Sequence, residues 1–101
     1  MSQNTLPADV EAFVARRFAA GDRHEALSLL RAATIHDGSP PELRLLRCAA
    51  VASGGSMERL RMEIETLKHD WRDVIVEGEY VPMDGKLVRV RNLAEPIPDE
   101  D

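Results

Sequence analysis

The strongest constraint on the fold is a run of apolar residues that recurs every three or four positions after residue 56. The residues of this run are Met57, Leu60, Ile64, Leu67, Trp71 and Val74. An α-helix places residues with this spacing on one face, so the run predicts a long helix that starts near residue 57. Ser56 is a good N-cap for it. The apolar face of this helix needs other helices to cover it.

Three shorter helices are predicted before it, at about 7–20, 23–35 and 41–53. Pro7 suits the first turn of a helix, and Gly21 ends the first apolar stripe. Gly54 and Gly55 end the third helix. The four helices therefore form two antiparallel pairs, and the fold class is mainly α.

The chain changes character after Trp71. Asp84-Gly85 is a favourable two-residue turn, and it predicts a β-hairpin of strands 79–83 and 86–90. Pro82 confines its strand to a sheet edge. The alternative is that the long helix continues through Val76 and the rest of residues 74–91 is irregular. We favour the long helix followed by the hairpin.

A chain of 101 residues is expected to build one core. Residues 1–93 are predicted to form a single helical domain with the C-terminal hairpin. Residues 94–101, AEPIPDED, hold four acids, two prolines and one large apolar residue, Ile97. This segment is expected to be a disordered acidic tail, because it cannot bury enough apolar surface to offset the entropy of ordering it.

The charge is concentrated in the second half of the chain. Residues 62–101 carry eleven acidic against five basic residues, a balance of −6, whereas residues 1–61 carry seven against eight. An acidic half favours a basic protein partner over nucleic acid. There is one cysteine, Cys48, and no charged leader or apolar run of about 20 residues. We therefore expect a cytoplasmic protein that does not enter a membrane.

No pattern of catalytic, cofactor-binding or metal-binding residues is found. His24-Glu25 begins like a zinc-protease helix, but Ser28 stands where the second histidine must be. Glu65 and His69 are one turn apart and supply too few ligands for zinc. The glycines form no phosphate-binding loop. We therefore predict a protein that is not an enzyme and that has no cofactor.

Residues 17–33, RFAAGDRHEALSLLRAA, resemble the middle of a tetratricopeptide repeat. Gly21 and Gly55, like Leu30 and Ile64, are 34 positions apart, which is the length of that repeat. The resemblance covers residues 7–70. It implies tandem helical hairpins with a peptide-binding groove, which would be lined by Glu11, Ala15, Phe18, Leu45 and Ala49.

These observations favour a small protein–protein interaction or regulatory module that forms a homodimer. The alternatives are a nucleic-acid-associated regulator with a basic face and a small enzyme with an unrecognised site. The residues proposed to contact partners are Trp71, Tyr80, Val88, Glu11, Phe18 and Leu45. Trp71 is also interpreted as a core residue that joins the last helix to the hairpin. In the homodimer, Arg89 or Arg91 is expected to meet Glu77 or Glu79 of the second copy.

Overall fold

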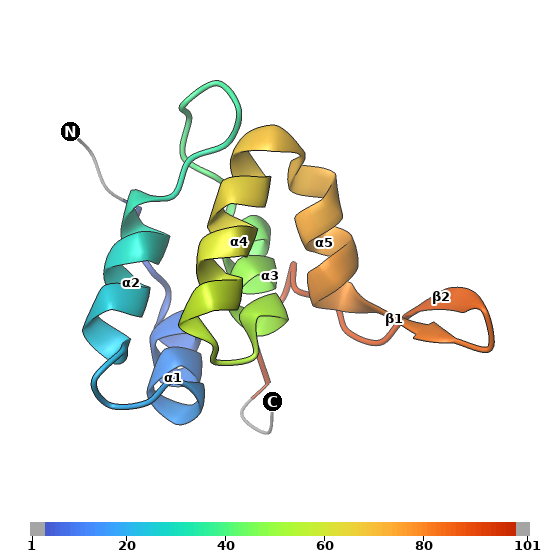
Figure 1. The fold of residues 1–101 in the computed structure, drawn as a ribbon, viewed down its shortest axis with the longest axis horizontal. Coiled ribbons are helices and arrows are strands. Elements are labelled where there is room, and N and C mark those ends of the chain that lie inside the picture. Colours follow the sequence, from blue (N-terminus) through green and yellow to red (C-terminus); the bar gives the residue numbers. More distant parts are fainter. Residues whose placement is uncertain (1–3, 99–101) are drawn as a thin grey trace.

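The computed structural model describes residues 4–98, and these residues form five helices followed by an antiparallel hairpin (Figure 1). The elements are α1 (Ala8–Arg17), α2 (Arg23–Ala32), α3 (Leu43–Ser53), α4 (Met57–His69), α5 (Trp71–Glu79), β1 (Tyr80–Met83) and β2 (Lys86–Arg89). The mainly helical fold class and the hairpin are confirmed. The prediction of four helices is not, because the last predicted helix is divided in two.

The division lies at Asp70, which leaves the helical conformation with φ −153° and ψ 91°. The Asp70 carboxylate accepts a hydrogen bond from the amide of Arg72 at 3.2 Å, so it caps the start of α5. Leu60, Ile64 and Leu67 of α4 are buried as their spacing predicts. Trp71 is 36% exposed, because α5 starts in a new direction and carries it out of the apolar face of α4.

Helix α3 lies at the centre of the helical body, and α1, α4 and α5 pack around it. Its residues 45–50 are all buried. The small residues Cys48, Ala49 and Ala50 allow the neighbouring helices to approach closely. A Cβ atom added to Gly78 of α5 would lie 2.7 Å from Cys48 Cβ, so only glycine fits where α5 crosses α3.

The hairpin projects away from the helical body beyond the end of α5 (Figure 1). Its register pairs Tyr80 with Arg89 and Val81 with Val88. Asp84 and Gly85 both have positive φ, 52° and 77°, as a two-residue turn of this kind requires. The turn and the two strands agree with the sequence prediction.

The segment after β2 returns to the helical body, which differs from the expected disordered tail. Leu93 and Ile97 are buried in the core, with Ile97 only 4% exposed. The Ile97 amide donates to Asp9 Oδ2 at 3.0 Å, and Arg47 donates to the Ala94 carbonyl at 3.4 Å. Disorder is therefore not confirmed for residues 94–98. Residues 99–101 lie outside the described part of the chain.

Candidate functional site

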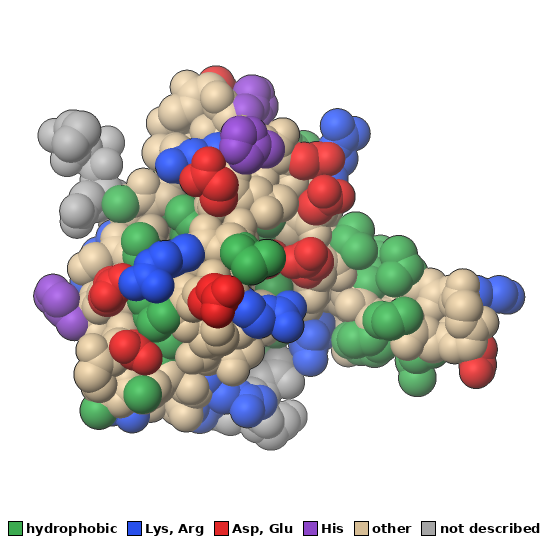
Figure 2. All heavy atoms as spheres, in the orientation of Figure 1, with side chains coloured by type: hydrophobic (Ala, Val, Ile, Leu, Met, Phe, Trp, Pro, Cys, Tyr) green, Lys and Arg blue, Asp and Glu red, His purple; other side chains and the backbone are tan. Residues whose placement is uncertain are grey.

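The exposed apolar surface of the molecule is concentrated on the hairpin. Met83, Leu87 and Val88 are 52%, 61% and 39% exposed, and Val90 just beyond β2 is also exposed. Figure 2 shows hydrophobic side chains along the projecting arm, with charged groups at its tip. We call residues 80–90 the hairpin arm. Side chains alternate between the faces of a strand, so Val88 and Leu87 expose apolar surface on opposite faces.

A buried carboxylate holds the base of the hairpin arm. Glu79, the last residue of α5, is fully buried. Arg44 of α3 donates to both Glu79 oxygens at 2.8 Å, and Arg89 of β2 donates from Nε at 3.0 Å. The Leu93 amide adds a further bond at 3.0 Å. One carboxylate thus joins α3, α5, β2 and the C-terminal segment, which restricts the direction of the arm.

The ion pairs at Glu79 also set its protonation. The hydrogen bond from Arg44 lowers the pKa of Glu79, burial opposes this, and the Leu93 amide and Arg89 lower it further, so the net pKa lies below its ordinary value. The neighbouring Cys48 has the opposite shift. Burial and the nearby Glu79 carboxylate raise the pKa of Cys48 to about 12, which keeps the thiol protonated and makes it a poor nucleophile.

Trp71 lines a groove beside α3 and α5. The groove has a volume of 440 Å³, and its lining residues are Ile35, Pro40, Glu42, Arg44, Leu45, Trp71 and Ile75. Its walls are mostly apolar. Arg44 is paired with Glu79, while the Glu42 side chain forms no ion pair or hydrogen bond within residues 4–98. The groove therefore combines an exposed indole with a carboxylate.

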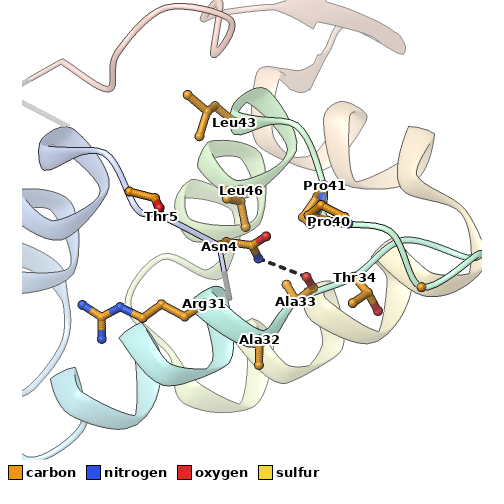
Figure 3. Close-up of a pocket in the computed structure, with 11 residues that line it drawn as sticks. Asn4, Thr5, Arg31, Ala32, Ala33, Thr34, Pro40, Pro41, Leu43 and Leu46 are labelled. Carbon is orange, nitrogen blue, oxygen red and sulfur yellow. Dashed lines mark hydrogen bonds between the residues drawn. The ribbon is translucent and has the colours of Figure 1, made fainter. Parts of the chain in front are cut away.

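A second hollow, of 320 Å³, lies where the N-terminal segment crosses α2 and α3 (Figure 3). The Asn4 side-chain amide donates to the carbonyls of Leu30 and Ala33 at 2.9 and 3.0 Å, so it satisfies the C-terminal end of α2. The side-chain nitrogen of Asn4 is therefore directed at the helix end. This hollow is explained by the packing of the N-terminal segment.

The structure brings together some of the residues proposed for partner contacts and separates others. Trp71 and Leu45 line the same groove. Tyr80 and Val88 both belong to the hairpin arm, where Tyr80 is half-buried. Glu11 is exposed on α1, and its Oε2 atom lies 3.9 Å from Nη2 of Arg31 in α2. Phe18 is buried in the core.

The structure also places the residues of two further expectations. Of the residues that the repeat resemblance would place in a groove, Phe18, Leu45 and Ala49 are buried in the core. The expected pairing of Arg89 or Arg91 with Glu77 or Glu79 of a second copy stays a prediction, but Arg89 and Glu79 are already paired within one chain. Arg89 Nη2 lies 2.9 Å from Glu79 Oε1 of its own chain, and Glu79 is fully buried.

Sequence reasoning did not identify Glu79 and Arg44 as the anchor of the arm. The two residues are 35 positions apart, and neither belongs to a recognisable local motif. Met83 and Leu87 also expose more apolar surface than Val88. The sequence signal for Met83 and Leu87 is their place as apolar residues in the two strands that flank the Asp84-Gly85 turn.

Among residues 4–98, no three His, Cys, Asp or Glu side chains lie close enough together to hold a metal ion. In the same range no helix is both long and apolar enough to cross a membrane. Comparisons with protein-family models, with curated proteins and with solved structures find no match to this chain. The resemblance to tetratricopeptide repeats therefore stays a prediction.

Proposed function

We propose that this chain is a non-catalytic protein–protein interaction module whose binding element is the hairpin arm. The observation that carries the proposal is the exposure of apolar side chains on both faces of a projecting ribbon. A two-stranded ribbon is only marginally stable in water by itself, and contiguous apolar surface is typical of interaction sites. The Glu79 ion pairs hold the arm in place before binding, which reduces the entropy lost when a partner docks.

The partner that fits the arm best is a second copy of the chain. A symmetric contact uses the same surface on both copies, so the exposed apolar residues of one arm cover those of the other. The arm is small compared with the roughly 800 Å² per partner of a standard interface. We therefore expect a homodimer with a dissociation constant in the micromolar range.

Sedimentation equilibrium at micromolar concentration tests this proposal. The wild-type protein should give about twice the chain mass of 11.3 kDa. Val88→Glu should shift the mass toward one chain, because it places a charge in the buried centre of the contact. Met62→Glu is the matched control, since Met62 is 60% exposed on α4 and outside the arm. A wild-type monomer, or equal effects of the two variants, would contradict the proposal.

The Trp71 groove is a second candidate surface, because it is apolar and carries the Glu42 carboxylate. We propose that it binds an apolar peptide segment followed by a basic residue. Trp71 is the only tryptophan of the chain, so its fluorescence reports directly on the groove. A short leucine-rich peptide ending in arginine should shift the emission, and the same peptide ending in glutamate should bind more weakly. Equal binding of both peptides would contradict a role for Glu42.

A further inference from the structure

The two edges of the hairpin arm differ in their free backbone groups. Met83 and Lys86 flank the two-residue turn, so they form a hydrogen-bonded pair and the pattern alternates from there. Val81 and Val88 then point their backbone groups at each other. The Val90 amide donates to the Glu79 carbonyl at 2.8 Å, which fits this alternation two residues further along. The residues of the alternate pairs, Pro82–Leu87 and Tyr80–Arg89, direct their backbone groups away from the partner strand, toward the outer edges of the hairpin.

The outer edge of β1 has no amide free for another strand. Its two outward positions are Tyr80 and Pro82. Pro82 has no amide hydrogen. The Tyr80 amide already donates to the Val76 carbonyl, where it caps the end of α5. This edge can therefore accept hydrogen bonds but cannot donate them.

The outer edge of β2 keeps its donors and acceptors. Its outward positions are Leu87 and Arg89, and each presents an N–H and a C=O group to the open side. Within residues 4–98 the sheet consists of β1 and β2 only, so no third strand covers this edge. Such an edge is a template for strand addition.

We propose that β2 pairs antiparallel with β2 of a second copy, with the two-fold axis at Val88, to give a four-stranded sheet in the order β1-β2-β2-β1. This inference rests on the proposed function and specifies its geometry. Leu87 of each copy exchanges backbone hydrogen bonds with Arg89 of the other, and the two Val88 residues lie directly opposite each other between these pairs.

The side chains of β2 favour this register over its neighbours. An axis at Arg89 would place two arginines directly opposite each other, and an axis at Leu87 would bring Gly85 of the turn into the pairing. With the axis at Val88, Lys86 lies opposite Val90 and no like charges are opposed. Arg89 of each chain is paired with its own Glu79, a carboxylate that it shares with Arg44, and this weakens the repulsion between the two arginines across the axis.

The charges at the ends of the paired stretch are complementary. Beyond the paired stretch the register carries the acidic turn residue Asp84 of one copy opposite Asn92 of the other, next to the basic Arg91. The assembly also ends at two copies. Its outer edges are both β1, which has no free amide at Tyr80 or Pro82, so further copies cannot add by the same contact. The second copy is thus the occupant that the arm fits.

Leu87→Pro tests the edge directly, because it removes the outward amide and no hydrogen bond within the hairpin. The matched variant Leu87→Ala removes most of the side chain and keeps the amide. By sedimentation equilibrium, Leu87→Pro should raise the dissociation constant of the dimer at least tenfold above that of Leu87→Ala, since the symmetric dimer loses a hydrogen bond at each Leu87. Equal dissociation constants for the two variants would overturn the inference.

Hydrogen exchange on the wild-type protein provides a measurement that does not depend on any variant folding. The amides of Leu87 and Arg89 should exchange more slowly as protein concentration rises, because association buries them in hydrogen bonds. The Gly85 amide should not change. Concentration-independent exchange at Leu87 and Arg89 in a solution that contains dimer would overturn the inference.

The outcomes separate this inference from the proposed function. A dimer that Val88→Glu dissociates, but in which Leu87→Pro behaves like Leu87→Ala, keeps the arm as the contact and overturns the pairing of the β2 edges. If the wild-type protein is still a monomer at about ten times the micromolar concentration expected for a small interface, both the proposed function and the pairing of the β2 edges are overturned.

Discussion

Glu79 of α5 and Arg44 of α3 form a two-point ion pair inside the protein, with both guanidinium-to-carboxylate distances at 2.8 Å. The Glu79 side chain has no solvent exposure, while Arg44 remains partly exposed. A buried carboxylate is stable only when its oxygens are paired, and here Arg44, Arg89 and the Leu93 amide pair them. The pair therefore couples the position of the hairpin arm to the helical core.

We predict that Glu79→Gln lowers the free energy of unfolding by about 2–3 kcal/mol, because it replaces charge-assisted hydrogen bonds with weaker ones in a buried position. It should also weaken the dimer, since the arm is less well held. Chemical denaturation of the monomeric Val88→Glu background measures the first effect without interference from association. Glu58→Gln, on the exposed side of α4, is the control and should change stability by less than about 0.5 kcal/mol.

Removing residues 94–101 should lower the melting temperature by about 10 °C. The truncation exposes the core around Ile97 and removes its amide bond to Asp9, a loss of roughly 2 kcal/mol for a domain of this size. Ile97→Ala in the full chain should give a smaller decrease in the same direction, and Glu95→Ala should have little effect because Glu95 is exposed. An unchanged melting temperature after truncation would show that residues 94–98 do not contribute to the core.

Leu67→Ala should lower the free energy of unfolding by about 2–5 kcal/mol. Leu67 is fully buried at the end of the α4 stripe, so its loss removes transfer energy and leaves a cavity. Met62→Ala on the exposed side of the same helix is the control, and it should change stability by less than about 0.5 kcal/mol. A comparable loss in both variants would mean that helix propensity, not packing, accounts for the effect.

Stability should fall as the pH rises from about 4.5 to 8, because of Glu63. This residue of α4 is buried, and its Oε1 atom has no hydrogen-bond partner. Burial, with the hydrogen bond and charge of Glu77 added, raises the pKa of Glu63 to about 8 from an ordinary value of 4.5. Between these two values the folded state holds a proton that the unfolded state has released, so folding weakens with rising pH.

Denaturation of wild type and Glu63→Gln at pH 5.5 and 8.5 measures this effect. The wild type should lose at least about 1 kcal/mol more than the variant between the two pH values, since one unit of pKa shift corresponds to about 1.4 kcal/mol. The lowered pKa values of Asp9 and Glu79 act in the opposite direction, because their stabilisation is lost only as the pH falls below the ordinary range of carboxylates. They should not affect this window.

The features predicted correctly from the sequence are those that depend on residues close together in the sequence. The spacing of Leu60, Ile64 and Leu67 identifies the buried face of α4, because helical geometry alone places them together. The Asp84-Gly85 turn predicts the hairpin and its register, since both residues adopt the positive φ that the turn needs. The same reasoning extended the α4 stripe to Trp71 and so missed the break at Asp70.

The sequence by itself therefore determined the mainly helical fold class, the hairpin and the buried face of α4. Only the tertiary structure decided that Glu79 pairs with Arg44, that Ile97 docks beside Asp9, and that the hairpin arm projects with its apolar side chains exposed. These features join residues that are 35 and 88 positions apart. Periodicity and turn propensity act over a few residues, whereas such contacts depend on how the helices pack around α3, and that packing is a property of the whole chain.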